Sequence, residues 1–129
     1  ARHARYGLAS FVYRNLDGVF DPARLATVAR RLPVATTEIG FAERVPAPRD
    51  DASPQVDVPD NTFAGVLRSK GFVRIAGHEG PAYYWSHAGR RLEVLAAPRA
   101  PPCKGQELVF IGAGLDWESI VRTLDSCLV

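Results

Sequence analysis

The chain has 129 residues, with 16 basic and 14 acidic side chains, a formal net charge of +2 and 47% hydrophobic residues. This is the size of one domain, and it can bury a core without disulfides or a metal. So small a charge argues against nucleic acid and anionic membranes as partners, and no apolar run approaches the roughly 20 residues that span a bilayer. We therefore expect one domain over residues 1–129. Its expected location is the cytoplasm, with an organelle as the alternative.

The first part of the chain predicts a strand and then a helix. Residues 6–14 are aromatic and β-branched and end at a turn signal, Asn15-Leu16-Asp17-Gly18, which is typical of a strand. Asp21 is suited to cap a helix and Pro22 to occupy its first position. Apolar residues then recur at i, i+3, i+4 and i+7, at Leu25, Val28, Ala29 and Leu32, which indicates one buried stripe.

Residues 33–62 have a different composition, with repeated prolines and, in the second half, clustered aspartates. This pattern is typical of a long surface loop. We expect a tolerated insertion here rather than a functional lid. A short strand over Thr36–Ala42 is possible inside it.

Residues 66–76 alternate as a strand with two different faces. One face is predicted to hold five small or apolar residues, namely Leu67, Ser69, Gly71, Val73 and Ile75. The opposite face is predicted to hold Arg68, Lys70, Phe72 and Arg74. We expect the helices to cover the apolar face and to leave the basic face open, because burial of apolar surface is favourable.

Three further strands and a helix complete the expected fold. Residues 82–86 and 91–95 form a hairpin, residues 106–112 form a strand, and a helix begins near Asp116. The buried stripe of that helix is Ile120, Val121, Leu124, Cys127 and Leu128. The order predicts an α+β fold: a two-layer sandwich of a mostly antiparallel four- to five-stranded sheet with two helices on one face.

No catalytic or metal-binding constellation stands out. The phosphate-binding pattern GxxxxGK[ST] is absent, no serine sits in a GxSxG elbow, and His and Cys residues lack paired ligand spacing. We therefore expect no catalytic residue, no metal ligand and no cofactor in this chain. Cys127 is expected to be buried, and Cys103, in a proline-rich loop, to be an exposed thiol.

The basic face of residues 66–76 is the most distinctive surface pattern. Arg68, Lys70 and Arg74, with Trp85 as a stacking residue, are candidates for binding an anion, an acidic partner or a neighbouring domain. Two plainer interpretations stay open. The charges can be a solvated strand face that discourages edge pairing, and the aromatic side chains can pack across the hairpin.

Five blocks, in order, resemble the CobW C-terminal domain family. The first is the strand of residues 6–14 followed by Phe20-Asp21-Pro22-Ala23-Arg24-Leu25. The second is Val66-Leu67-Arg68-Ser69-Lys70-Gly71-Phe72, and the third is Trp85-Ser86-His87-Ala88-Gly89. The closing strand, residues 106–112, and Leu124-Asp125-Ser126-Cys127-Leu128 complete the set. The resemblance covers nearly the whole chain except residues 33–62.

The resemblance implies a domain from the C-terminal part of CobW-type P-loop GTPases, which act as metal chaperones or insertases. Members are linked to cobalamin synthesis, zinc transfer and nitrile hydratase activation. The family's GTP site, its Mg²⁺ and its Cys-rich motif for a transition metal lie in an N-terminal domain that this chain lacks. Where many members have His, this chain has Asp21, which speaks against metal held here.

On this basis we expect a non-catalytic regulatory and protein-interaction domain of a GTP-dependent metal chaperone. The expected partners are the N-terminal GTPase domain of the same protein and a client metalloprotein. The chain begins at Ala1 without methionine, so we expect a fragment of a longer protein. The alternative is a free-standing anion- or ligand-binding α/β module that uses Arg68, Lys70 and Trp85. An enzyme with a shallow site is the third and weakest hypothesis.

Overall fold

The computed structural model describes residues 8–41, 58, 61–77, 82–97 and 105–129. Their elements in chain order are β1 (Leu8–Asn15), α2 (Pro22–Ala29), β2 (Thr36–Ile39), β3 (Val66–Val73), β4 (Ala82–Ala88), β5 (Arg91–Ala97), β6 (Gln106–Ala113) and α3 (Trp117–Asp125). No helix among these residues has the length and apolar character needed to cross a bilayer.

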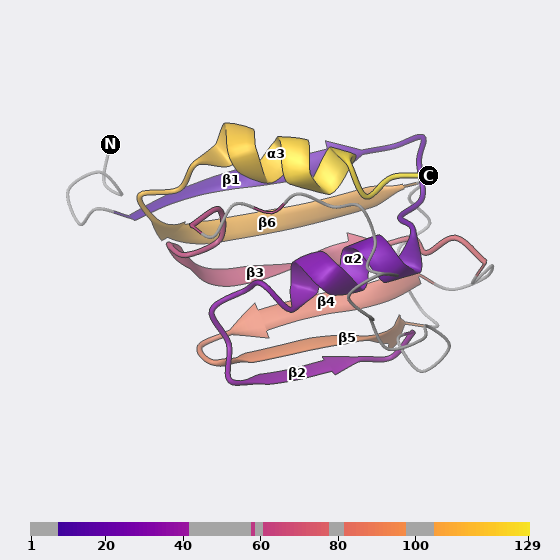
Figure 1. Cartoon of the computed structure of the whole chain (residues 1–129), viewed down its shortest axis with the longest axis horizontal. Helices are drawn as coiled ribbons and strands as arrows, with labels where there is room; N and C mark the ends of the chain where they lie inside the picture. The colour runs from indigo at the N-terminus through magenta and orange to yellow at the C-terminus, as the bar shows by residue number, and fades with distance from the viewer. Residues whose placement is uncertain (1–7, 42–57, 59–60, 78–81, 98–104) are drawn as a thin grey trace.

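In the described part of the chain, six strands form one sheet in the order β1-β6-β3-β4-β5-β2 (Figure 1). Four of the neighbouring pairs are antiparallel, and β2 runs parallel to β5. The α+β class, the two helices and the mostly antiparallel sheet are confirmed. The predicted number of four to five strands is too low, because the short segment after Pro33 joins the sheet edge as β2.

The helix boundaries follow the capping signals. The carboxylate of Asp21 accepts a hydrogen bond from the backbone N–H of Arg24 at 2.9 Å, and Pro22 opens α2. Asp116 caps α3 in the same way, accepting from the N–H of Ser119 at 3.1 Å. An N-cap side chain satisfies a backbone donor that the helix leaves unpaired. Both helices therefore start where the sequence places them.

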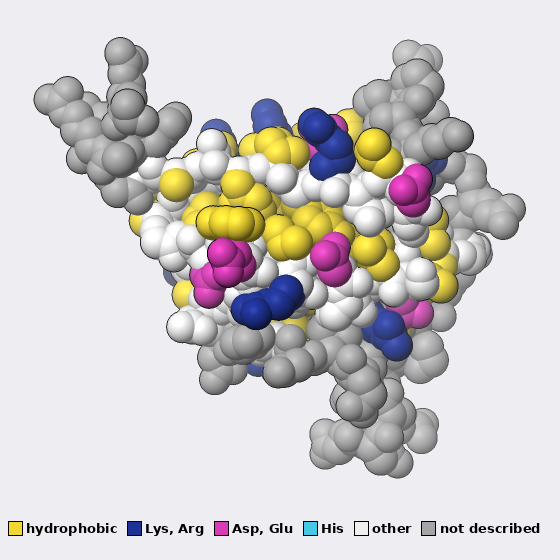
Figure 2. Space-filling model, turned by 90° about the horizontal axis from the view of Figure 1, so that it is seen from above, with side chains coloured by type: hydrophobic (Ala, Val, Ile, Leu, Met, Phe, Trp, Pro, Cys, Tyr) yellow, Lys and Arg dark blue, Asp and Glu magenta, His cyan; other side chains and the backbone are white. Residues whose placement is uncertain are grey.

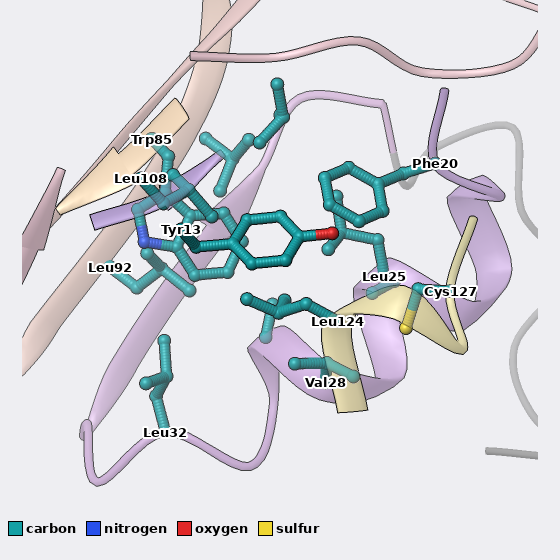
Figure 3. Packing of buried hydrophobic residues seen from close by; sticks show 14 of the residues in the cluster. Tyr13, Phe20, Leu25, Val28, Leu32, Trp85, Leu92, Leu108, Leu124 and Cys127 are labelled. Carbon is teal, nitrogen blue, oxygen red and sulfur yellow. The ribbon is translucent and has the colours of Figure 1, made fainter. Parts of the chain in front are cut away.

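Both helices lie in front of the same face of the sheet in Figure 1, with α3 over β1 and β6 and α2 over β3 and β4. We call this the covered face. Figure 3 shows the packing between the helices and the sheet, with the Tyr13 ring among Phe20, Leu25 and Leu124. All four side chains are buried, and Leu25 and Leu124 have no exposed surface. This core supplies the main drive for folding.

Tyr13 also ties the first strand to the last helix. Its hydroxyl donates a hydrogen bond to Asp125 Oδ1 at 2.8 Å. Burial, and then the hydrogen bond with this carboxylate, raise the pKa of Tyr13 well above its ordinary value. The phenol therefore stays protonated and keeps its role as a donor.

A β-bulge changes the predicted face of Leu67. The register between β3 and β6 shifts between Val66, which pairs with Gly112, and Arg68, which pairs with Ile111. Leu67 is therefore an extra residue of β3 with no partner position of its own on β6. Leu67 is 54% exposed, while Val66 and Val73 are buried. The expectation that Leu67 lies on the apolar face is therefore wrong, and Val66 occupies the buried position instead.

The predicted loop of residues 33–62 begins inside the folded domain. Residues 36–39 form β2, and Phe41 is 1% exposed with its ring edge-on to Tyr83 at 5.4 Å between centroids. Val58 and Phe63 also belong to the buried cluster. Residues 42–57 and 59–60, where the insertion was expected, lie outside the described residues, so the insertion itself stays a prediction.

Candidate functional site

The opposite face of the sheet carries the exposed side chains, and we call it the open face. Pairing register and strand alternation place its members on one side. They are Val12, Arg14, Arg68, Lys70, Phe72, Tyr84, Glu93, Leu95, Glu107, Val109 and Ile111, with Arg91 and Glu38 near the β2 edge. The expectation that Arg68 and Lys70 stand on an exposed strand face is confirmed.

The acidic side chains of the open face already have cationic partners. Glu107 on β6 lies 3.2 Å from Arg14 on β1. Glu93 and Glu38 flank Arg91, at 3.2 and 3.9 Å. These pairs are exposed, so each contributes little to stability. They do, however, cancel much of the charge at the two sides of the face.

Arg68 and Lys70, on the central strand β3, are in a different position. Arg68 lies between Ile111 and Ala88 in the register, and Lys70 lies between Val109 and Ser86. All four of these cross-strand neighbours are uncharged. Within the described residues, neither cation forms an ion pair. The centre of the open face therefore presents two positive charges without an acidic neighbour on the adjacent strand positions.

An aromatic pair lies beside these cations. The rings of Phe72 and Tyr84, directly opposite one another on β3 and β4, are 5.3 Å apart. Tyr84 is 40% exposed and its cross-strand neighbour Leu95 is 38% exposed. Aromatic residues and arginine are enriched in protein interfaces relative to the rest of the surface.

Hydrophobic side chains continue around the edge of the sheet. Figure 2, which views the molecule from the side of β1 and α3, shows a band of them among scattered charges. Val12 on β1 is 49% exposed and Trp117 at the start of α3 is 56% exposed. Strand alternation places Val12 on the open face, so the apolar surface of that face reaches the β1 edge.

Of the other two predicted site residues, Trp85 does not join Arg68 and Lys70 on the open face, and Arg74 lies just beyond the end of β3. Strand β3 ends at Val73, so Arg74 lies outside the paired rows, where its N–H donates to Gln106 Oε1 at 2.8 Å. Trp85 is 1% exposed and points to the covered face, because it lies one residue from Tyr84 on the same strand. The three-residue surface set of Arg68, Lys70 and Trp85 is therefore not formed.

Trp85 instead belongs to a buried polar group behind the open face. Its indole N–H donates to Ser69 Oγ at 2.9 Å, and the same oxygen lies 3.2 Å from His87 Nδ1. His87 is 1% exposed, and its Nε2 has no hydrogen-bond partner among the described residues. Burial lowers the pKa of His87 below its ordinary value of 6.5. The imidazole is thus held in its neutral form.

Potential metal ligands are scattered in the described part of the chain. None of its His, Cys, Asp and Glu side chains gather in threes or more as a metal site would require. Cys127 is buried, as expected, and burial raises its pKa to about 11, so its thiol is a poor nucleophile at neutral pH. Cys103 and His78 lie outside the described residues, and the expected exposure of Cys103 stays a prediction.

Comparison with known proteins identifies the family. Residues 8–128 match the model of the cobalamin synthesis protein cobW C-terminal domain. The chain belongs to this family. No curated protein sequence matches the chain.

Two crystal structures share the fold of this CobW C-terminal domain. One is the Zn(II)-bound YjiA GTPase from E. coli, and the other is a Zn(II)-bound triple mutant of YjiA GTPase. Each aligns with a TM-score of 0.61 at 19% identity, covering 94% of this chain and 30% of the other. The chain thus spans less than a third of the length of these GTPases.

Sequence reasoning found the two central cations of this CobW C-terminal domain but missed much of what surrounds them. Leu95 and Val109 were not assigned to any surface, and Tyr84 was considered only together with its neighbours Tyr83 and Trp85, as able to stack a ligand or to pack across the hairpin. Alternation gives each of the other strands two faces, over residues 82–86, 91–95 and 106–112. Only the pairing register shows which of the two faces lies on the same side of the sheet as Arg68. The bulge at Leu67 has no comparable signal.

Proposed function

We propose that this CobW C-terminal domain is a non-catalytic interaction and regulatory domain of a GTP-dependent metal chaperone. Its open face would contact the GTPase domain of the same protein, and in turn a client metalloprotein. Family membership and the 30% coverage of YjiA GTPase support a place within a longer GTPase. The open face, with Arg68 and Lys70 unpaired beside Phe72 and Tyr84, is the observation that carries the proposal.

The proposed division of labour follows from the residues this chain carries. GTP and Mg²⁺ need a phosphate-binding loop and its lysine, and the sequence contains neither. In the proposal, nucleotide and transition metal are bound by the GTPase domain, and delivery in zinc homeostasis or cobalamin synthesis is the biological setting. The C-terminal domain contributes a contact surface whose partner changes with the nucleotide state. The cytoplasmic location stays a prediction.

A binding experiment tests the proposal. This chain is titrated into the GTPase domain encoded by the same reading frame, loaded with Mg²⁺ and either GDP or a non-hydrolysable GTP analogue, in a calorimeter. We expect association in at least one state, with an affinity that differs between the two. The chain alone is expected to neither bind nor hydrolyse GTP.

Two results would overturn the proposal. The first is an absence of association in both nucleotide states, measured with each domain shown to be folded by circular dichroism. The second is GTP binding at micromolar concentration by this chain alone, which would give it a nucleotide site of its own.

A further inference from the structure

We propose that the open face recognises an acidic segment of its protein partner, with carboxylates over Arg68 and Lys70 and an apolar side chain against Phe72 and Tyr84. This inference rests on the proposed function, since it names the chemistry of the partner at that same surface. It concerns a protein segment, as opposed to a nucleic acid or a lipid headgroup.

The distribution of charge across the sheet is the first step. Going from β1 to β2, the open face presents the Arg14–Glu107 pair, then Arg68 and Lys70, and then Arg91 between Glu93 and Glu38. The centre is therefore positive, and the β5–β2 side has one more acid than base. Only a segment whose negative charge is placed over β3 matches this pattern.

The spacing of the two cations is the second step. Arg68 and Lys70 are two positions apart on one strand, so their Cα atoms lie about 7 Å apart along the same face. Acidic residues at alternate positions of an extended segment have the same spacing. Two carboxylates of such a segment can thus meet both cations at once, which a single isolated acid cannot.

The apolar neighbours supply the affinity. Exposed ion pairs contribute little by themselves, typically below about 1 kcal/mol, and they mainly steer and orient the encounter. Phe72 and Tyr84 lie in the row next to Lys70, and aromatic side chains dominate binding energy at interfaces. An apolar residue of the partner two positions beyond its acids, on the same side of the extended segment, would therefore cover this pair.

The acidic side chains of the face argue against a polyphosphate partner. Glu107, Glu93 and Glu38 lie on the same surface as the cations. They would repel the continuous negative charge of a nucleic acid or an anionic bilayer. A protein segment avoids this repulsion, because its charges can be confined to the centre of the sheet.

The test uses a defined peptide with two acids and an aromatic residue at successive alternate positions, Ser-Glu-Ser-Glu-Ser-Phe-Ser-amide, with fluorescein attached to its N-terminal amine, so that all three side chains point to one side of the extended segment. Binding to this chain is followed by fluorescence anisotropy, and the contact residues are mapped by amide shifts in NMR spectra. We expect shifts on β3, β4 and β6. We also expect the affinity to fall at least tenfold in the double variant Arg68→Glu with Lys70→Glu.

A matched control changes the same amount of charge on the helix side. Arg30 and Arg122 are exposed residues of α2's C-cap and of α3, and the double variant Arg30→Glu with Arg122→Glu is expected to bind the peptide within twofold of the original chain. The Tyr84→Ser variant is expected to weaken binding about threefold to tenfold. Circular dichroism checks that all variants stay folded.

Several outcomes overturn the inference. These are equal loss of binding in both charge variants, shifts confined to α2 and α3, or equal affinity for a peptide with glutamine in place of each glutamate. Tighter binding of a 20-nucleotide single strand or of vesicles containing 30% phosphatidylserine would assign the cations to nucleic acid or lipid instead. No detectable peptide binding at millimolar concentration also overturns it.

The same variants separate this inference from the proposed function. If the GTPase domain binds the Arg68→Glu, Lys70→Glu variant as tightly as the original chain, the inference of an acidic segment is wrong, while the proposal of an interaction domain is still supported. If the GTPase domain does not associate while the peptide binds as expected, the acid-binding surface stands and its assignment to the GTPase is wrong.

Discussion

The two faces of strand β3 differ in what they demand of the sequence. On the covered face, Ser69 and Val73 are 1% and 0% exposed; the Ser69 hydroxyl accepts a hydrogen bond from Trp85, and Val73 belongs to the buried hydrophobic cluster. On the open face, Arg68 and Lys70 are exposed and contact uncharged neighbours. A single run of eight residues therefore serves stability on one side and is free to serve recognition on the other. Substitutions that separate these roles test the comparison.

Gly71 on the covered face is expected to give the largest effect. Its φ is +153°, and a Cβ there would stand 1.8 Å from the carbonyl oxygen of Glu107, so β3 and β6 could not pair as they do. Gly71→Ala should cost more than about 5 kcal/mol, which is the whole stability of many domains. Urea unfolding followed by circular dichroism measures this.

Gly89 provides the control for that prediction. It also has a positive φ, +59°, but a Cβ there meets nothing within 4 Å. Gly89→Ala should therefore cost only about 1 kcal/mol, from the strained backbone conformation alone. Equal losses in the two variants would show that β3 does not approach β6 as closely as described.

Adjacent residues of β4 give the next largest difference. Trp85 is buried and its N–H is bonded to Ser69, whereas Tyr84 is 40% exposed on the other face. Trp85→Ala should cost about 3 to 5 kcal/mol, and Tyr84→Ala about 1 kcal/mol. The comparison breaks if thermal and urea unfolding give similar losses for both.

A pH series sharpens the contrast through His87. Because burial lowers its pKa in the folded chain, the unfolded chain takes up a proton first as the pH falls. The contribution of the neutral ring is fully present above the unfolded value of about 6.5 and is lost as the pH drops through the folded pKa. Urea midpoints between pH 7.5 and 5 should fall less steeply for His87→Gln than for the original chain.

That prediction fails if the two pH dependences run parallel, since the loss would then belong to other groups. If the His87→Gln curve lies below the curve of the original chain by the same amount at every pH, the variant reports only a change in packing. The slope difference is therefore the measured quantity.

The smallest effect is expected on the open face. The double variant Arg68→Glu with Lys70→Glu removes no ion pair among the described residues and places its new charges in solvent. Its free energy of unfolding should stay within about 0.5 kcal/mol of the original. An unfolded double variant in the same urea series would mean that these side chains are structural.

The sequence predicted the parts of the fold that depend on local chemistry. Asp21 followed by Pro22 marks the start of a helix, because the carboxylate can accept a hydrogen bond from the first turn and proline has the φ of a first helical residue. The stripe of Leu25, Val28 and Ala29 is buried because its spacing puts all three on one side of that helix, and Leu32, just beyond the end of the helix, is buried as well. The exposure of Arg68 and Lys70 follows from alternation in the same way.

What sequence reasoning missed depends on neighbours distant in the chain. The bulge at Leu67 arises where β3 meets β6, and nothing in residues 66–76 alone reports a register shift. The parallel pairing of β2 with β5 joins Thr36 to Arg91, which no local turn specifies. The face of Trp85 likewise becomes evident only when its hairpin is placed against β3.

The contact between Tyr13 and Asp125 has a consequence for how the chain acquires its structure. The two residues are 112 positions apart, and β1 pairs within the described sheet only with β6, the last strand to be made. At ribosomal rates of about 5 to 20 residues per second, Asp125 is added roughly 6 to 20 s after Tyr13. For that interval the first strand is made but has neither its partner strand nor its covering helix. During this interval, chaperones or rapid completion of synthesis must keep its apolar side chains from contacts with other exposed apolar segments.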